Sequence, residues 1–167
     1  MGSGVDLRTG FGLDVHAIGG PGPVVLGGVE IAHSAGLVGH SDADCLFHAV
    51  GDALLGAAAL GDLGEHFPDD APELAGADSA VLLARIVSMV AGEGWEIAHV
   101  DVTVVAQEPR VAPHRPSMRE NLARVCGIGL DRASVKATTT ERLGFLGRSE
   151  GIAAVAVATV ARPQQPG

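Results

Sequence analysis

The sequence predicts a single α+β domain in which a mixed sheet of four or five strands carries helices on one face. Three observations lead to this class. The 167 residues fit one domain with a true core, and no linker or internal repeat divides them. Hydrophobic residues make up 47% but aromatic ones only 3%, so the core must be aliphatic. Strand-like and helix-like segments follow one another throughout the chain.

The N-terminal half is expected to contain two strands and a helix. The apolar segment 10–18 is typical of a strand and is followed by a Gly/Pro break. Segment 24–31 predicts a second strand, with Gly27 and Gly28 as a bulge or kink inside it. Ser41 or Asp42 can cap an Ala/Leu-rich helix that extends to about Leu60.

The C-terminal half is expected to contain two helices and three strands. Asp78 or Ser79 can cap a helix that extends to residue 92, and a further helix runs from Pro116 or Ser117 to Cys126. Strands are predicted over 99–107, 135–138 and 151–161. The last of these is almost entirely apolar, as in a central or subunit-facing strand, so the sheet face without helices is expected to meet another subunit.

The domain itself is expected to span 8–161. Residues 1–7 are interpreted as disordered or left over from an expression vector, and 162–167 as a tail. No signal peptide or membrane-spanning segment is evident, and Cys45 and Cys126 form no C-x-x-C pattern. We therefore expect a cytoplasmic protein with no membrane partner.

The charge balance argues against nucleic-acid binding. Lys plus Arg is 11 and Asp plus Glu is 20, which gives a net charge of −9. A protein that neutralises a phosphate backbone needs the opposite sign. A small phosphorylated substrate remains compatible with this charge if metal ions, a few basic side chains and helix N-termini bind it.

A candidate metal site carries the most chemical information. Asp14 and His16 share one face of the first predicted strand, and His48 lies in the following helix. Two imidazoles and a carboxylate suit catalytic zinc, which keeps an open position. Asp44 and Asp52, four residues either side of His48, are candidate outer partners that would fix its tautomer, although either could instead be solvated or cap a neighbouring turn. Taken by themselves, Asp14 and His16 are more often an ordinary polar pair in a strand. A single histidine such as His48 is more often a core histidine than a metal ligand.

Two further polar clusters favour binding of an anion. His40 and Ser41 precede a helix, where an imidazole and backbone N–H groups can face a phosphate, although Ser41 could simply cap the helix. Segment 136–141 places three threonines between Lys136 and Glu141, which suits phosphate and Mg²⁺ contacts, although threonine runs are also common in strands. Arg110 follows a strand and could clamp a phosphate or simply be exposed.

Many ordered motifs resemble the 2-C-methyl-D-erythritol 2,4-cyclodiphosphate synthase family of the non-mevalonate isoprenoid pathway. The resemblance extends from about residue 8 to residue 161. The matching segments are GLDVH (12–16), GHSDAD (39–44), HAVGDALLG (48–56), ALGDLG (59–64), FPD (67–69), GADS (76–79), DVT (101–103), VKATTTE (135–141), LGF (143–145), GR (147–148) and EGI (150–152).

The resemblance implies a phosphorus–oxygen lyase, or cyclase. Its substrate would be 4-diphosphocytidyl-2-C-methyl-D-erythritol 2-phosphate. The 2-phosphate attacks the β-phosphate, closes the cyclodiphosphate ring and releases CMP. No protein nucleophile is required, so catalysis depends on positioning and charge stabilisation.

The resemblance also implies roles for individual residues. Asp14, His16 and His48 would hold one Zn²⁺ per subunit, and Glu141 would help to hold Mg²⁺ or Mn²⁺ on the diphosphate. His40 and Thr139 would be catalytic, stabilising the transition state. Substrate contacts are expected from Asp14, His16, His40, Ser41, Asp62, Gly64, Phe67, Asp69, Ala106, Arg110, Val111, Ala112, Thr138, Thr139, Glu141, Phe145 and Arg148.

The family's assembly is a homotrimer with active sites shared between subunits. This implies that the open sheet face packs within a trimer, and that Phe145 and Arg148 lie near a threefold channel that can hold an isoprenoid diphosphate. Two rival functions stay open. One is a zinc hydrolase that uses a metal-bound water, and the other is a non-catalytic trimeric binding protein with a structural metal and Cys45 as a fourth ligand.

Overall fold

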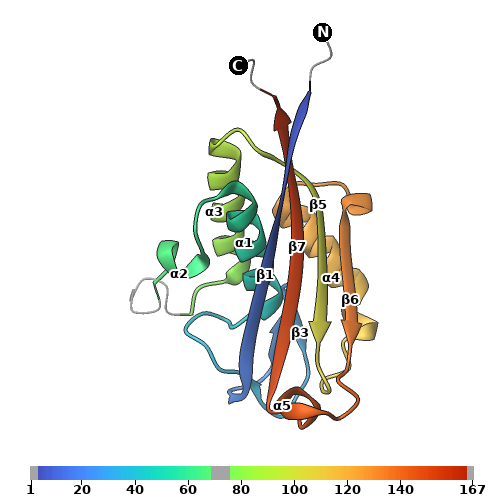
Figure 1. Ribbon diagram of the computed structural model, residues 1–167. Helices are drawn as coiled ribbons and strands as arrows, with labels where there is room; N and C mark the ends of the chain where they lie inside the picture. Colours follow the sequence, from blue (N-terminus) through green and yellow to red (C-terminus); the bar gives the residue numbers. More distant parts are fainter. Residues whose placement is uncertain (1–3, 69–75, 165–167) are drawn as a thin grey trace.

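A five-stranded mixed sheet forms the centre of the computed structural model, which describes residues 4–68 and 76–164 (Figure 1). Its order is β4-β1-β7-β5-β6, and only β5 and β6 are parallel neighbours. This confirms the predicted α+β class. The strands are β1 Val5–Gly20, β4 Gly36–Leu37, β5 Glu96–Val105, β6 Ala133–Thr138 and β7 Gly151–Pro163.

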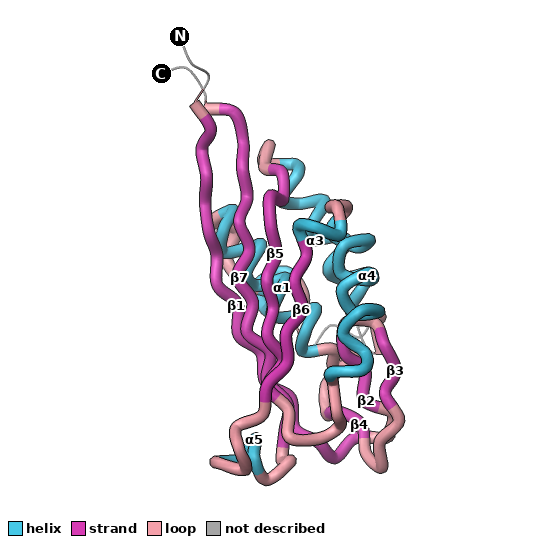
Figure 2. Tube along the Cα trace, turned by 90° about the vertical axis from the view of Figure 1, so that its right-hand side faces the viewer, coloured by secondary structure: helices cyan, strands magenta, loops and turns pink. Residues whose placement is uncertain are grey.

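The long helices all lie on one side of this sheet (Figure 2). They are α1 Cys45–Ala58, α3 Ser79–Gly92 and α4 Arg115–Cys126. The core between the layers is mainly aliphatic, with Phe47 and Met118 among its largest fully buried side chains. Short segments complete the fold: α2 Leu63–His66, α5 Gly144–Gly147 and the 3₁₀ turns Ala112–His114 and Leu130–Arg132. None of these four was predicted.

The segment predicted as one bulged strand is a two-stranded hairpin. β2 Val24–Leu26 pairs with β3 Val29–Ile31, and Gly27 and Gly28 form the turn between them. Both glycines have positive φ, +57° and +68°, as the turn of a tight hairpin requires. The prediction of a bulge was therefore wrong, because two glycines in succession made a turn rather than a distortion.

The helix α1 begins later than predicted. Its cap is Asp44, whose side chain accepts hydrogen bonds from the N–H groups of Leu46 and Phe47. The predicted caps, Ser41 and Asp42, therefore precede the helix and are available for other contacts. By contrast, Asp78 caps α3 as predicted, with an Oδ1 to Ala80 N distance of 2.8 Å.

The terminal strands also extend beyond their predicted ends. Val5 pairs with Pro163 and Leu7 with Ala161, so part of the segment expected to be disordered belongs to β1. In residues 4–68 and 76–164, no helix is long and apolar enough to cross a bilayer.

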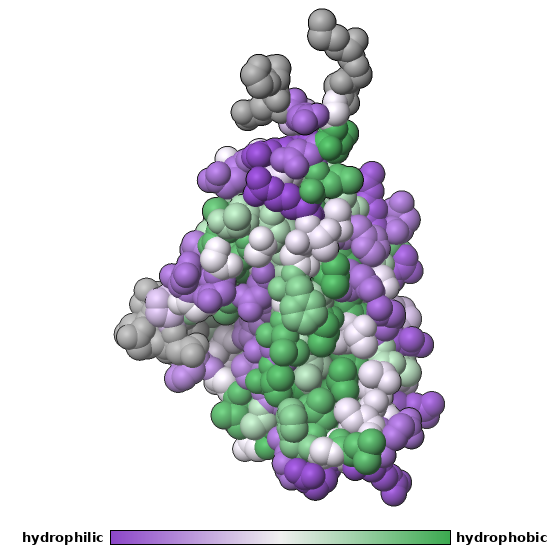
Figure 3. All heavy atoms as spheres, viewed as in Figure 1, coloured by the Kyte–Doolittle hydropathy of each residue, from purple (hydrophilic) through white to green (hydrophobic). Residues whose placement is uncertain are grey.

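The sheet face opposite the helices is apolar and exposed. Along β1, Phe11, Leu13 and Val15 point to this open face and are 64%, 53% and 44% exposed. Figure 3 shows apolar side chains gathered along this face, over β1 and β7. We refer to this surface, defined by Phe11, Leu13, Val15 and Val157, as the open face.

Candidate metal centre and substrate pockets

The close approach of α1 to β1 creates the candidate metal centre. Gly10 and Gly12 face the helix, and a Cβ at Gly12 would lie 1.9 Å from the carbonyl oxygen of Ala49. The helix can therefore pack directly on the backbone of β1. Two residues further along the same strand face, Asp14 meets His48 of α1.

Three potential metal ligands converge at this point. The Oδ2 atom of Asp14 lies 2.9 Å from His16 Nε2 and 3.2 Å from His48 Nδ1, and the two nitrogens are 3.3 Å apart. Ligands bound at about 2.0–2.1 Å in a tetrahedron lie about 3.3 Å from one another. The three predicted ligands thus form a group that fits one metal ion, with a fourth side open to a pocket.

The outer nitrogens of both imidazoles have partners that favour this geometry. His16 Nδ1 lies 2.8 Å from the carbonyl oxygen of Val38, so it must carry a proton, and Nε2 presents a lone pair to the group. His48 Nε2 lies 2.9 Å from Ser79 Oγ. Imidazole lone pairs this close to a carboxylate repel it. The arrangement is therefore favourable only when the groups share a proton or a cation.

The predicted outer partners of His48 were wrong. Asp44 is fully buried and accepts hydrogen bonds from backbone N–H groups, including Gly27 at 2.9 Å and Gly28 at 2.7 Å. Its carboxylate therefore joins the β2–β3 turn to the start of α1. Asp52 accepts a hydrogen bond from Leu63 N at 2.8 Å, and burial raises its pKa.

The electrostatics of the group are dominated by its single carboxylate. Burial alone would raise the pKa of Asp14, but hydrogen bonds with His16 and His48 hold it well below its usual range. Burial would lower the pKa of His16, but the hydrogen bond with Asp14 raises it above its ordinary value. Asp14 is therefore ionised and available as an anionic ligand at neutral pH.

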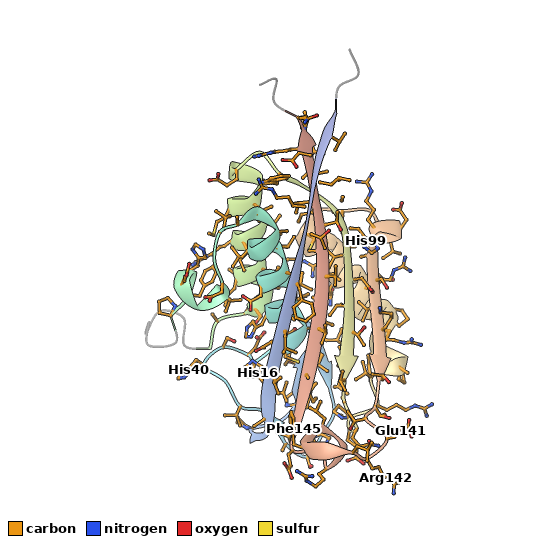
Figure 4. The ribbon with its side chains drawn as sticks, viewed as in Figure 1. His16, His40, His99, Glu141, Arg142 and Phe145 are labelled. Carbon is orange, nitrogen blue, oxygen red and sulfur yellow. The ribbon has the colours of Figure 1, made fainter. Side chains whose placement is uncertain are left out.

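A pocket of about 480 Å³ opens beside the metal group. Figure 4 shows His16 and His40 beside the β1 edge of the sheet. The pocket brings together many of the predicted site residues, includes Asp52 and Pro68, and adds Val38, Gly39, Leu63 and Leu82, which were not predicted. Its predicted lining residues are Asp14, His16, His40, Ser41, His48, Gly64 and Phe67.

A second pocket, of about 410 Å³, lies where β5 and β6 end. Its lining combines small residues with the oppositely charged Glu108 and Arg110. The predicted residues found there are Ala106, Arg110, Val111, Ala112, Thr138 and Thr139. The chain thus distributes the predicted site over two pockets rather than one.

Asp62, Glu141 and Phe145 lie outside both pockets. Asp62 caps α2 by accepting a hydrogen bond from Glu65 N at 3.0 Å. Glu141 accepts one from the Thr139 hydroxyl at 3.2 Å and lies below the β5–β6 side of the sheet, whereas His16 lies beside β1 (Figure 4). Phe145 is about half-exposed in α5.

Arg148 forms an exposed ion pair with Glu150, with Nε to Oε1 at 2.6 Å. Asp69 lies outside the described residues.

Cys45 does not belong to the group of metal ligands. It is fully buried in the first turn of α1, and burial raises the pKa of its thiol well above the ordinary value. Within the described parts of the chain, the group contains Asp14, His16 and His48 but no cysteine. The rival hypothesis of a closed structural site with Cys45 as fourth ligand is therefore not supported by this geometry.

Sequence reasoning missed Asp42 and Ser79, which lie behind His48. Their segments were among the matching motifs, GHSDAD and GADS, but each residue has an alternative reading as a helix cap. Each helix needs only one capping side chain, whereas each of these two motifs offers more than one. The surplus carboxylate and hydroxyl are the signal that could have identified Asp42 and Ser79.

A family model and curated relatives match nearly the whole chain. The YgbB family model matches residues 7–161. The 2-C-methyl-D-erythritol 2,4-cyclodiphosphate synthase of Pseudomonas paraeruginosa is 57% identical over 152 residues, which cover 91% of this chain and 97% of the relative. The enzyme of the same name from Thioalkalivibrio sulfidiphilus is 56% identical over 155 residues, covering 93% and 97%.

Solved structures agree with these matches. A 2C-methyl-D-erythritol-2,4-cyclodiphosphate synthase with bound CDP superposes with a TM-score of 0.84 at 32% identity, covering 92% of this chain and 99% of that one. The bifunctional IspDF of Campylobacter jejuni gives a TM-score of 0.92 at 40% identity. It covers 95% of this chain, but this chain spans only 43% of the bifunctional protein.

Proposed function

The chain belongs to the YgbB family, and from that premise we propose that it is a cyclodiphosphate synthase of isoprenoid precursor biosynthesis. It converts 4-diphosphocytidyl-2-C-methyl-D-erythritol 2-phosphate to 2-C-methyl-D-erythritol 2,4-cyclodiphosphate and CMP. An oxygen of the 2-phosphate forms a bond to the β-phosphorus, and the bond from that phosphorus to the oxygen of CMP breaks. The observation that carries the proposal is the group of three ligands beside an open pocket, in a chain of this family.

The donor set fits zinc. Two imidazole nitrogens and one carboxylate oxygen leave a fourth position on the pocket side, as catalytic zinc sites do. Bound there, Zn²⁺ would polarise the β-phosphate and offset its charge. The chain's own contribution is to hold Asp14, His16 and His48 at this spacing and to keep the histidine lone pairs directed at one point.

Other side chains complete the charge stabilisation. We assign His40 and Thr139 to the phosphate oxygens that gain charge in the transition state, because each carries a donor beside one of the two pockets. Glu141 offers a hard oxygen ligand for Mg²⁺ or Mn²⁺ on the diphosphate.

The remaining predicted residues bind the substrate in this proposal. Ser41 contacts the methylerythritol phosphate, and Asp62 and the Gly64 backbone contact sugar hydroxyls. Phe67 and Asp69 belong to the substrate loop, and Arg110 is at the phosphates. Cytidine is bound by Ala106, Val111, Ala112 and Thr138.

We propose a homotrimer with shared active sites, and the separation of the two pockets supports this assembly. β7 lies between β1 and β5, so the strands that bear the pockets are two strand spacings, roughly 9–10 Å, apart. In this proposal each substrate lies between the metal pocket of one subunit and the nucleotide pocket of the next. The exposed apolar open face supplies a surface for such an assembly.

Phe145 and Arg148 are assigned to a threefold channel that can hold an isoprenoid diphosphate.

A cytoplasmic location is compatible with Cys45 and Cys126, which are both free and buried.

The test is to follow the zinc- and Mg²⁺-loaded protein by phosphorus NMR with the diphosphocytidyl substrate. We expect cyclic diphosphate and CMP, and a loss of rate on the order of 10²–10³ or more in His48→Ala. His33→Ala is the matched control, since His33 bonds locally to the Ala35 carbonyl and lies outside both pockets. A linear product that incorporates solvent oxygen would indicate a hydrolase, and metal binding without turnover would indicate a binding protein.

A further inference from the structure

A buried hydroxyl and a carboxylate lie directly behind the ligand His48. Ser79, only 1% exposed at the start of α3, places Oγ 2.9 Å from His48 Nε2. The same hydroxyl hydrogen-bonds Asp42 Oδ1, and Ser79 N donates to Asp42 Oδ2 at 3.2 Å. His48, Ser79 and Asp42 thus form a chain of hydrogen bonds that leads away from the metal group.

The direction of this chain follows from the number of protons. A carboxylate only accepts hydrogen bonds, so the single Ser79 proton must be donated to Asp42. The Ser79 oxygen then accepts from His48, which places the imidazole proton on Nε2. The lone pair of His48 therefore lies on Nδ1, the atom 3.2 Å from Asp14.

Asp14 favours the opposite arrangement when no metal is bound. A proton on His48 Nδ1 could be donated to the Asp14 carboxylate, which would occupy the atom that a metal must bind. The Ser79 hydroxyl competes with this arrangement by requiring the proton on Nε2. Asp14 therefore favours the His48 proton on Nδ1, whereas Asp42, acting through Ser79, favours it on Nε2.

Ser41 is a weaker alternative partner for His48. Its Oγ lies 3.3 Å from the same Nε2 and accepts a hydrogen bond from Ala43 N at 3.2 Å. Ser79 is closer and is fixed by two bonds to Asp42. The backbone strengthens this link, because Asp42 N donates to the Ala77 carbonyl at 3.2 Å and Gly76 N to that of His40 at 2.7 Å.

We infer that Ser79 and Asp42 are positioning residues that hold His48 in its metal-binding tautomer and orientation. They tie the metal centre to the N-terminus of α3 and, through the segment that bears His40, to the substrate pocket. The inference rests on the metal site of the proposed function. It assigns to these two residues the part that the sequence suggested for Asp44 and Asp52.

The test compares Ser79→Ala, Asp42→Asn and the control Ser88→Ala. Ser88 is exposed on the same helix, and its hydroxyl donates to the Ala84 carbonyl at 3.0 Å. Zinc is titrated into the metal-free proteins against a chelating dye. We expect Ser79→Ala to bind zinc about 10–100-fold more weakly, Asp42→Asn to show a smaller loss, and Ser88→Ala to match the wild type.

A second readout separates positioning from simple loss of structure. In nitrogen–proton NMR of metal-free protein, His48 should carry its proton on Nε2 in the wild type and in Ser88→Ala, and shift toward Nδ1 in Ser79→Ala. Should Ser79→Ala fail to fold, the shape-conserving Asp42→Asn decides by the same two measurements. Unchanged zinc affinity and an unchanged tautomer in the variants would overturn the inference, whereas a wild type that binds no zinc would overturn the metal site itself.

Discussion

The two faces of β1 differ sharply although their residues alternate along one backbone. Toward α1 the strand presents Gly10, Gly12 and then Asp14, with no side chain at the first two positions. Toward the open face it presents Phe11 and Leu13, both large and exposed. A shift of one residue would exchange the two sets. The same register therefore determines both where His48 meets Asp14 and which apolar surface is offered to another subunit.

The two faces should respond differently to substitution. On the helix face, backbone atoms of α1 occupy the space into which a side chain would grow, so any added atom displaces the helix and its ligand. On the open face, the isolated chain has free space, so a substitution there should alter assembly and leave the fold intact.

The largest effect is expected from Gly12→Ala. The new Cβ would meet Ala49 O at 1.9 Å and Ala53 N at 2.8 Å, and backbone atoms cannot rotate away. We expect the free energy of unfolding to fall by about 2–4 kcal/mol, at or above the upper end of the usual range for overpacking. Urea unfolding followed by circular dichroism, at matched protein concentrations, measures this change.

Gly56→Ala is the matched control for that substitution. Gly56 lies in α1, and a Cβ there meets nothing within 4 Å. Replacement should leave stability unchanged or raise it by up to about 1 kcal/mol, because alanine favours a helix more than glycine does. If Gly12→Ala were as stable as Gly56→Ala, the close approach of α1 to β1 would not be the feature that fixes the metal group.

The next effect concerns the open face. Leu13→Asp places a charge where the proposed assembly buries an apolar side chain, and should weaken association by about 2 kcal/mol or more per subunit. Light scattering after size exclusion, over a dilution series, should show smaller species than the wild type, with an unchanged far-ultraviolet spectrum.

Val81→Asp is the corresponding control on the helix side of the molecule. Val81 is also exposed, but it lies on α3. This variant should keep the wild-type mass. A Leu13→Asp protein that also kept the wild-type mass would show that the open face is not the assembly surface.

The sequence predicted which residues lie on each face of β1 better than it predicted the contacts between distant segments. Alternation along β1 placed Asp14 and His16 together, because a strand repeats every two residues. The incorrect prediction of the partners of His48 also came from a local rule, the spacing of residues along a helix. Asp44 and Asp52 follow helical spacing, but the carboxylate of Asp44 caps α1 and that of Asp52 holds the start of α2.

Long-range contacts explain most of the remaining errors. Ser79 reaches His48 across 31 residues, and only the packing of α3 against α1 brings them together. Three polar candidates, Ser41, Asp42 and Asp44, precede α1 within four positions, and local propensity does not rank them. The choice of Asp44 depends on the hairpin turn at Gly27 and Gly28, which donates two further hydrogen bonds to the same carboxylate.

The smallest expected effect is a pH-dependent one at an ion pair on the sheet surface. Lys136 Nζ lies 2.6 Å from Asp101 Oδ2, between β6 and β5, and both side chains are partly exposed. Burial would raise the pKa of Asp101, but the hydrogen bond with Lys136 holds it below its ordinary value. Because solvent screens such a pair, Asp101→Asn should cost only about 0.2–1 kcal/mol at pH 7.

The sign of the pH dependence distinguishes this ion pair from a packing contact. Since the folded pKa of Asp101 lies below the unfolded value of about 3.9, its contribution is complete above about pH 5 and is lost as the pH falls through the folded value. Urea unfolding of Asp101→Asn in the Leu13→Asp background avoids the effect of assembly. The stability difference should shrink below pH 4 and in 1 M salt, and a difference that persisted under both conditions would mean that Asp101 acts through packing instead.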